Sequence, residues 1–274
     1  MISCDFFGGL GNNLFQLATV YSIHKLCDVE LQIPSTVDRG NIGIYGQETK
    51  LELNNLFENE FIYNDHLQLT RHKHSDADLN QTDYSYVPVE LYDNVCYHGY
   101  FQSERYFLGV DISKEFQLRK SNVDQIKTQH QQLFDKKTIS LHYRLGGDRV
   151  TDIMQNYHKT VSIDYYKTAL ETSNFNTDEY NILVFSDRMD QCKELLKELD
   201  YPFHFIQNEN NVLDFTMMSL CDTNIVSNST FSWWAAYMNQ NKHKQVIVTE
   251  SEWFGPGYKH FNLTDTFPES WIRL

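Results

Sequence analysis

Small hydroxyl and amide side chains gather in the segment SNSTFSWW, residues 227–234. The apolar run 223–226 before it predicts a buried strand, and the residues after Thr230 predict a helix with a broad apolar face. Asn228, Ser229 and Thr230 are therefore expected at a helix N-terminus, where free N–H groups and the helix dipole can hold a phosphate. The same residue types are favoured helix N-caps, so capping alone is the alternative interpretation.

Polar side chains also follow two other predicted strands. The run 138–142 ends in His142 and is followed by Arg144 and Asp148, and the run ending at Phe185 is followed by Asp187. If these strands are parallel neighbours, their carboxyl ends open into one crevice, which is where open α/β sheets bind ligands. We therefore expect polar groups from these strand ends to converge on one ligand.

The N-terminus has the pattern of a Rossmann-type unit. A short strand is predicted over 2–7, a helix over 12–27 and a second strand over 29–33. The turn between the first strand and the helix contains Gly8, Gly9 and Gly11. This spacing is neither the dinucleotide fingerprint nor a P-loop, but glycines there let a backbone approach a ligand closely.

The pattern weakens between residues 36 and 88, and 71–83 is its most loop-like part. An Asp-x-Asp at Asp76 and Asp78, with nearby histidines, could suggest a metal site. The histidines are His66, His72 and His74. The aspartate pair does not end an apolar strand, so we interpret the segment as a solvated loop.

The second half alternates regularly between strand and helix patterns. Strands are expected at 138–143, 181–185, 203–206, 223–227 and 245–249, and helices at 163–172, 189–199, 212–221 and 230–239. This alternation predicts a parallel sheet. With a polar stretch over 120–137, it indicates two domains, 1–135 and 136–274.

Composition excludes several classes of protein. The 274 residues carry a net charge of −14, which argues against a nucleic-acid partner. Five scattered cysteines do not form a disulfide scaffold or a zinc motif. Because no apolar run is long enough for a transmembrane segment and no secretory signal is visible, we expect a soluble, cytoplasmic protein.

Five ordered segments resemble one known family. They are GGLGNNLFQLA (8–18), GYFQSERYF (99–107), FSDRMDQCKELL (185–196), DFTMMSLCDTNIVSNSTFSWWAAYMN (214–239) and FPESWIRL (267–274). Together they are similar to the glycosyltransferase family 11 fucosyltransferases, typified by the alpha-1,2-fucosyltransferases. The segment SLHYRLGGDRV (140–150) departs from that family's His-x-Arg-Arg-Gly-Asp-Tyr: Leu145 replaces the second arginine, and Asp148 falls one position late.

The resemblance implies an α/β fold of GT-B type, with two Rossmann-type domains facing across a cleft. The N-terminal domain would face the acceptor glycan, and the C-terminal domain would bind the donor, GDP-L-fucose. The implied reaction is an inverting, metal-independent transfer of fucose to a hydroxyl of the acceptor, with a galactoside as the implied acceptor and an alpha-1,2 linkage. No further cofactor is expected, and the oligomeric state is not indicated.

The implied donor-binding residues are Gly8, Gly9, Gly11, Asn12, His142, Arg144, Asp187, Asn228, Ser229 and Thr230. Arg144 would neutralise the departing diphosphate, with a structural ion pair to a carboxylate as the alternative. Asp187 would accept the N–H donors of guanine, or else cap the following helix. His142 would contact the base or ribose, and the glycines could form only a tight turn with Asn12 as a cap.

The acceptor hydroxyl must lose its proton, and Asp148 and Glu104 are the candidate bases by motif position. Trp233 and Trp234 are interpreted as helix core. Two other functions stay open: transfer of another sugar, because the loop after His142 is altered, and binding of a nucleotide or glycan without turnover.

Overall fold

The structure is a computed structural model that describes residues 1–36, 49–75, 84–147 and 151–274. The chain forms two compact units: Met1–Arg119 with His260–Glu269, and Lys120–Lys259 with Ser270–Leu274. The division at Arg119 precedes the expected boundary after residue 135, and a C-terminal segment returns to the first unit.

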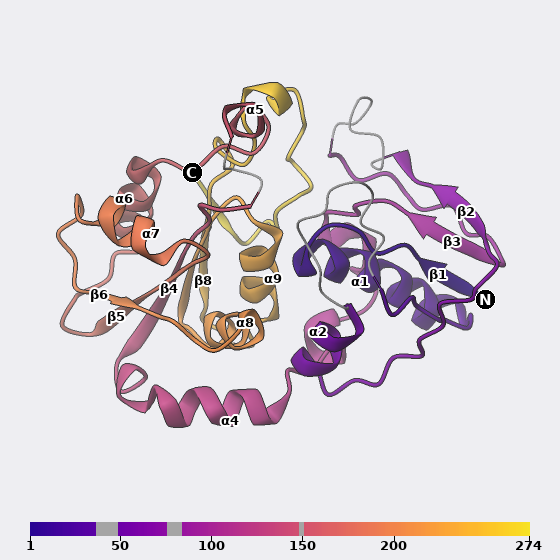
Figure 1. The fold of residues 1–274 in the computed structure, drawn as a ribbon, viewed down its shortest axis with the longest axis horizontal. Coiled ribbons are helices and arrows are strands. Elements are labelled where there is room, and N and C mark those ends of the chain that lie inside the picture. The colour runs from indigo at the N-terminus through magenta and orange to yellow at the C-terminus, as the bar shows by residue number, and fades with distance from the viewer. Residues whose placement is uncertain (37–48, 76–83, 148–150) are drawn as a thin grey trace. The chain divides into compact units, whose positions relative to one another are not determined.

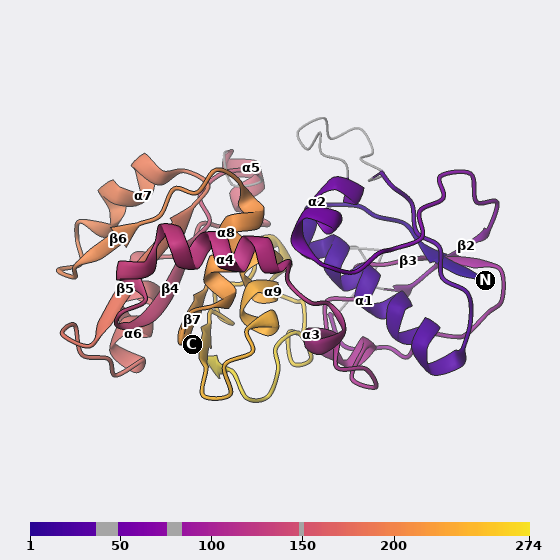
Figure 2. The same cartoon turned by 90° about the horizontal axis from the view of Figure 1, so that it is seen from below.

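The first unit is built on a parallel sheet whose strand order is β1-β3-β2. The strands are β1 (Ile2–Cys4), β2 (Thr70–Lys73) and β3 (Val95–His98). The helices are α1 (Leu10–Cys27), α2 (Thr49–Leu56), the 3-10 helix η2 (Glu104–Tyr106) and α3 (Ile112–Glu115). Helix α1 packs along the sheet (Figure 2). Residues 31 and 33, expected in a second strand, form only isolated bridges.

The expected loop over 71–83 is partly wrong, because Thr70–Lys73 pairs with β3 as a strand. The histidines there have structural partners: the ring of His72 lies 4.8 Å from that of Tyr92, and His74 is buried with its Nε2 3.1 Å from the Val87 carbonyl oxygen. Strand β2 was not predicted because its residues are polar, and such side chains are common on the edge strand of a sheet. Asp76 and Asp78 lie outside the described residues.

The second unit is built on a parallel sheet of order β6-β5-β4-β7-β8-β9. The strands are β4 (Lys137–Tyr143), β5 (Tyr180–Ser186), β6 (Phe203–Phe205), β7 (Thr223–Val226), β8 (Gln245–Val248) and β9 (Ile272–Arg273). The order reverses next to β4, whose neighbours are β5 and β7. Ligands bind at such a switch point. The expected α/β class, parallel sheet and alternation are confirmed.

Helices cover both faces of this sheet. They are α4 (Lys120–Gln129), α5 (Asp152–Gln155), α6 (Ile163–Thr172), α7 (Met189–Leu196), α8 (Asn211–Ser219) and α9 (Thr230–Met238), with short 3-10 helices η3 (Gln131–Leu133) and η4 (Pro256–Tyr258). Figure 1 shows α6 and α7 on one face of the sheet and α8 and α9 on the other. The unit is therefore doubly wound.

Alternation along β4 assigns its side chains to the two faces. Ile139, Leu141 and Tyr143 belong to the apolar core with residues of α6 and α7. His142, the residue between the last two, instead contacts α9. Trp233 and Trp234 of α9 are completely buried, which confirms their interpretation as core.

A buried polar network attaches α9 to the sheet. Asn224 Nδ2 in β7 donates to Ser140 Oγ in β4 at 2.7 Å, and Asn239 Nδ2, just after α9, donates to Asn224 Oδ1 at 2.9 Å. Buried amides that are satisfied in this way specify one arrangement, since an unpaired partner would be costly. The network therefore sets where α9 lies against β4 and β7.

Helix α4 explains why the boundary lies earlier than expected. It packs against α8 of the second unit, and the following residue His130 lies 3.0 Å from Asn208 Oδ1 through its Nε2. Asn181 Nδ2 also donates to the Leu133 carbonyl at 2.8 Å. Within the polar stretch 120–137, Lys120–Gln129 is thus a helix with one buried residue, Ile126.

Truncation of the sheet core should destabilise the second unit. Ile139→Ala removes a completely buried side chain and should lower the free energy of unfolding by about 2–5 kcal/mol. All four tryptophans belong to this unit, so their fluorescence during urea unfolding measures the effect. Ile153→Ala is the matched control, because Ile153 is 78% exposed and should change stability by less than about 0.5 kcal/mol. Equal losses in both variants would contradict this account of the core.

Candidate active site

The candidate site lies where β4, β5 and β7 end side by side in the second unit. Tyr143 at the end of β4 pairs with Ser186 at the end of β5, and Leu141 pairs with Ile225 in β7. The Arg144 backbone N–H then donates to Ser227 Oγ at 3.4 Å, which connects the chain after β4 to the chain after β7. The segments that follow these three strands therefore converge.

An ion pair joins Arg144 to Asp187. Arg144 Nη1 lies 3.0 Å from Asp187 Oδ2, and the same carboxylate accepts the backbone N–H groups of Leu145 at 2.9 Å and Gly146 at 3.1 Å. Asp187 as a whole residue is exposed, yet its side chain is only 27% accessible because the carboxylate turns onto the 144–146 loop. The ion pair that the sequence indicated as the alternative role of Arg144 is thus observed, and its partner is the carboxylate of Asp187 after β5.

The same contacts control the protonation of Asp187. Burial raises the pKa of its carboxyl group, but the charge of Arg144 and the N–H groups of Leu145 and Gly146 outweigh burial and hold the pKa below its ordinary value. Asp187 does not cap α7, since Arg188 occupies the N-cap position. The capping alternative for Asp187 is therefore wrong.

Leu145 and Gly146 each have a packing reason. Leu145, at the position of the family's second arginine, is only 5% exposed and belongs to the apolar core with α6 and α7. A Cβ added at Gly146 would lie 2.8 Å from Asp187 Oδ2 and 3.0 Å from Arg188 Nε. The departure from the family motif thus replaces a cation with a buried side chain, and a glycine lets Asp187 approach the loop.

The turn between β7 and α9 presents a helix N-terminus at this end of the sheet. Ser229 occupies the N-cap position with extended backbone, but its side chain makes no capping hydrogen bond. Ser229 and Thr230 are half-buried, and Thr230 is the first residue of α9. Capping by the Ser229 hydroxyl is therefore not what the structure shows.

Asn228 is buried and holds this turn in place. Its Nδ2 donates to the carbonyl oxygens of Lys159 at 2.8 Å, Glu252 at 3.3 Å and Trp253 at 3.3 Å. These bonds connect the turn to the chain before α6 and after β8. The observed contacts of Asn228 support the shape of the site.

His142 is buried and faces α9. Its Nδ1 lies 2.9 Å from Ser232 Oγ, and its ring lies 5.9 Å from that of Phe231. Ser227 and Ser232, which hold Arg144 and His142, were not among the predicted site residues. Their position near Ser229 in the hydroxyl-rich segment 227–234 was the available signal.

The glycine turn lies in the first unit and starts α1. Gly8 has a φ of +80°, and a Cβ there would lie 2.3 Å from Asn12 Nδ2. Gly9 is the N-cap of α1, and Gly11 is buried inside the helix. Asn12 lies in the first turn, where its Oδ1 accepts Gln102 Nε2 at 3.0 Å. Asn12 is therefore not the helix cap, and the alternative that assigned it that role is wrong.

Of the two candidate bases, Glu104 lies in the first unit. Glu104 is half-buried at the start of η2 in the first unit, after Ser103, whose Oγ accepts the Arg105 backbone N–H. Asp148 lies outside the described residues.

Within the described ranges, no group of three His, Cys, Asp or Glu side chains is arranged to bind a metal ion. None of the helices in those ranges combines the length and hydropathy that a bilayer span requires.

The chain is similar in fold to solved structures of fucosyltransferases. The chain is similar to the fucosyltransferase NodZ from Bradyrhizobium, with a TM-score of 0.53, 12% identity and coverage of 86% of this chain and 92% of that one. It is also similar to POFUT1 in complex with GDP-fucose, with a TM-score of 0.58, 13% identity and coverage of 90% and 97%. At these identities the likeness shows the fold, which is of GT-B type.

The match to a family model over nearly the whole chain defines the class of protein as a glycosyltransferase. The chain belongs to Glycosyl transferase family 11, whose model matches residues 2–273. It is 26% identical to an alpha-1,2-colitosyltransferase of Escherichia coli, over 97% of this chain and 96% of the relative. It is also 32% identical to the O-antigen biosynthesis glycosyltransferase WbnK of Escherichia coli, over 50% of this chain and 44% of that protein. The expected family is confirmed.

The depressed pKa of Asp187 predicts a pH-dependent contribution to stability. Because its folded pKa lies below the unfolded value of about 3.9, the carboxylate stabilises the fold above about pH 4, and this contribution is lost as the pH falls through the folded pKa. Asp187→Asn should therefore lower the free energy of unfolding at pH 7 and change it less at pH 3. Urea unfolding at both pH values measures this, with Asp190→Asn on exposed α7 surface as the control. A loss that is independent of pH would contradict the assignment.

Proposed function

We propose that this glycosyltransferase moves L-fucose from GDP-L-fucose to a hydroxyl of an acceptor glycan, with inversion and without a metal ion. The observation that carries the proposal is the convergence of Arg144 and the N-terminus of α9 at the switch point of a doubly wound sheet in a family 11 chain. Fucosyltransferases with the same fold, among them a complex with GDP-fucose, support the donor.

The transfer breaks the bond between the anomeric carbon and the diphosphate. Positive charge develops on the sugar ring, as in other glycosyl reactions with oxocarbenium character, and negative charge develops on the leaving group. The Arg144 guanidinium would bind phosphate oxygens from one side, while the first N–H groups of α9 and the hydroxyls of Ser229 and Thr230 would bind them from the other. Fixed donors of this kind can neutralise the leaving group in place of a metal ion.

Asp187 would act mainly as a positioning residue in this reaction. Its contacts with Arg144, Leu145 and Gly146 hold the guanidinium and the loop before any ligand binds. In its other proposed role, Asp187 would accept hydrogen bonds from the N–H donors of guanine. The carboxylate would then bind the loop and the base at the same time. Gly8, Gly9, Gly11 and Asn12 would approach the donor from the first unit, and His142 would contact its base or ribose.

The acceptor would be a galactoside and the linkage alpha-1,2, as the resemblance implies. The alpha-1,2-colitosyltransferase relative supports this linkage and also a second candidate function, the transfer of a different deoxysugar. The buried Leu145 favours that candidate as well, because the donor loop lacks one cation of the family motif. Side-by-side assays with GDP-fucose and GDP-colitose distinguish the two.

Nucleotide binding tests the diphosphate site directly. GDP should raise the melting temperature, whereas UDP and ADP should not, and EDTA should leave the GDP shift unchanged. Arg144→Ala should weaken GDP binding by about ten- to a hundredfold, since it removes a charge-assisted contact of about 1.5–3 kcal/mol. Arg273→Ala is the matched control: it lies in the same unit but pairs with Glu250 at 3.5 Å. If UDP with manganese raised the melting temperature and GDP did not, the proposal would be overturned.

Turnover distinguishes an enzyme from a binding protein and identifies the base. The protein should release GDP from GDP-fucose in the presence of an acceptor from a panel of galactosides, and NMR of the product should show inversion at the anomeric carbon. If Glu104 is the base, Glu104→Gln should lower kcat by about 10²–10⁴ and leave the Kd for GDP unchanged, whereas Asp148→Asn should have this effect if Asp148 is the base. Full turnover in both single variants would exclude both carboxylates as the base.

A further inference from the structure

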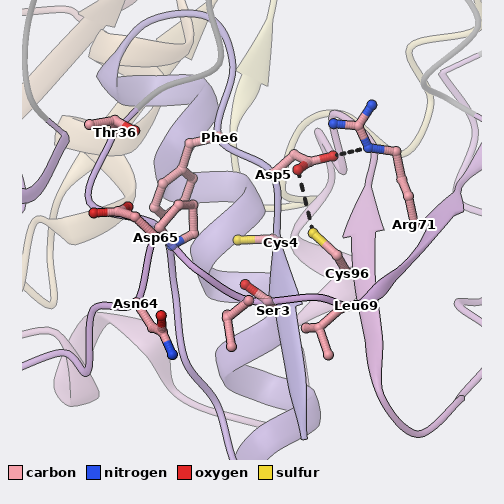
Figure 3. A pocket seen from close by; sticks show the side chains of 12 residues that line it. Ser3, Cys4, Asp5, Phe6, Thr36, Asn64, Asp65, Leu69, Arg71 and Cys96 are labelled. Atoms are coloured by element: carbon pink, nitrogen blue, oxygen red, sulfur yellow. Dashed lines mark hydrogen bonds and ion pairs between the residues drawn. The ribbon is translucent and has the colours of Figure 1, made fainter.

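A polar pocket lies within the first unit, apart from the residues discussed above. Its volume is about 360 Å³, at the small end of the range for ligand sites. The polar side chains that line it are those of Ser3, Asp5, Thr36, Asn64, Asp65 and Arg71. Figure 3 shows these groups coming from β1, β2 and the chain around residues 34–36 and 64–69.

Asp5 is the most strongly held of these groups. Its Oδ2 lies 3.0 Å from His98 Nδ1 and 2.7 Å from Arg71 Nε, while Oδ1 accepts a weak bond from Cys96 Sγ at 3.4 Å. Figure 3 shows the contacts with Arg71 and Cys96. Burial raises the pKa of Asp5, but the His98 hydrogen bond and the Arg71 charge outweigh it and keep the carboxylate ionised. A carboxylate oxygen has two lone pairs, so Oδ1 can accept a ligand hydroxyl.

The remaining lining suits a ring with polar edges and apolar faces. Asp65 accepts the Ser35 backbone N–H at 2.7 Å, which fixes its carboxylate on the opposite wall. Phe6, Pro34, Leu67 and Leu69 supply apolar surface. Carboxylates, an amide and a guanidinium among such side chains are able to bind the hydroxyls and the C–H face of a pyranose.

Charge selects among sugars. Asp5, Asp65 and Arg71 give the lining a net charge of −1, from two carboxylates and one guanidinium. Burial raises the pKa of the Cys4 thiol well above its ordinary value and that of Cys96 to about 12, so both thiols stay neutral. A negative lining disfavours phosphates and uronic acids.

The pocket lies close to the glycine turn of the same unit. Phe6 lines the pocket, and Gly8 is two residues later in the chain, so their Cα atoms are at most about 8 Å apart. A sugar bound here would therefore lie next to the turn that the proposed function assigns to the donor.

We propose that this pocket binds one neutral pyranose of the acceptor glycan, with Asp5 and Asp65 accepting its hydroxyls and Arg71 donating to its oxygens. This inference rests on the proposed function, which supplies the acceptor glycan that the pocket would bind. It gives the first unit a specificity-determining role: the pocket selects neutral over acidic acceptors.

Methyl NMR of the full chain tests the pocket and the donor site separately. Leucine and valine methyl groups are labelled with ¹³C, and the protein is titrated with methyl β-galactoside, methyl β-glucoside, methyl N-acetyl-β-glucosaminide, methyl β-glucuronide and, in a separate sample, GDP. At least one neutral glycoside should shift the Leu67 and Leu69 signals, and the glucuronide should bind at least about tenfold more weakly. GDP should shift the Val226 signal in the second unit instead.

Variants show whether the response comes from the pocket. Asp5→Asn should weaken binding of the neutral glycoside by about tenfold or more, because a hydrogen bond to a charged group is lost. Leu69→Trp fills the cavity without changing its charge and should abolish binding, whereas Asp93→Asn, on an exposed carboxylate of the same unit, should have no effect. All three variants should keep the GDP response at Val226, and unchanged methyl signals of Leu14 and Leu17 in the core of the first unit verify that this unit is folded.

Three results would overturn the inference while leaving the proposed function in place. The first is a GDP response at Val226 with no response of Leu67 and Leu69 to any neutral glycoside. The second is a glucuronide that binds as tightly as the neutral sugars. The third is glycoside binding that Leu69→Trp leaves unchanged. Loss of the GDP response in the unaltered protein would instead count against the proposed function.

Discussion

The ion pair between Arg144 and Asp187 is the contact on which the arrangement of the second unit's site depends. It is only partly accessible to solvent, so each charge relies on the other, and loss of one partner would leave the second poorly compensated. The Asp187 carboxylate also binds two successive backbone N–H groups of the 144–146 loop. One side chain from the end of β5 therefore determines the position of both the cation and the loop that follow β4.

The doubly wound sheet supplies the other half of the geometry. Its apolar face, covered by α6 and α7, contains no polar side chain that the site uses, and Leu145 anchors the loop there. The opposite face carries Ser140, His142 and Asn224, which bind α9 and the residues around it. Because those groups are satisfied in only one arrangement, the N-terminus of α9 stays beside the end of β4, where its N–H groups can act together with Arg144.

The first unit also holds a charged side chain with an ion pair, but the supported group there is a carboxylate. Its first strand leads through a glycine at positive φ into the N-terminus of α1, and the same strand contributes Asp5 to the polar pocket. Here a carboxylate is held by Arg71 and His98, so the guanidinium supports an acceptor group, whereas at Arg144 the carboxylate supports a cation. The two units thus differ in the group that is supported: a cation in the second unit and a carboxylate in the first.

The sequence by itself determined the repeating elements of the second unit, the helix after the glycine turn and the buried tryptophans, because periodicity and burial are recorded locally along the chain. Only the tertiary structure decided that Asp187 binds the loop 42 residues before it, that Leu145 joins the core and that helix α4 belongs with α8. It also revealed β2, whose polar residues look like a loop until β3 pairs with them. These outcomes depend on which distant groups meet, and the energies of such contacts leave no pattern in neighbouring residues.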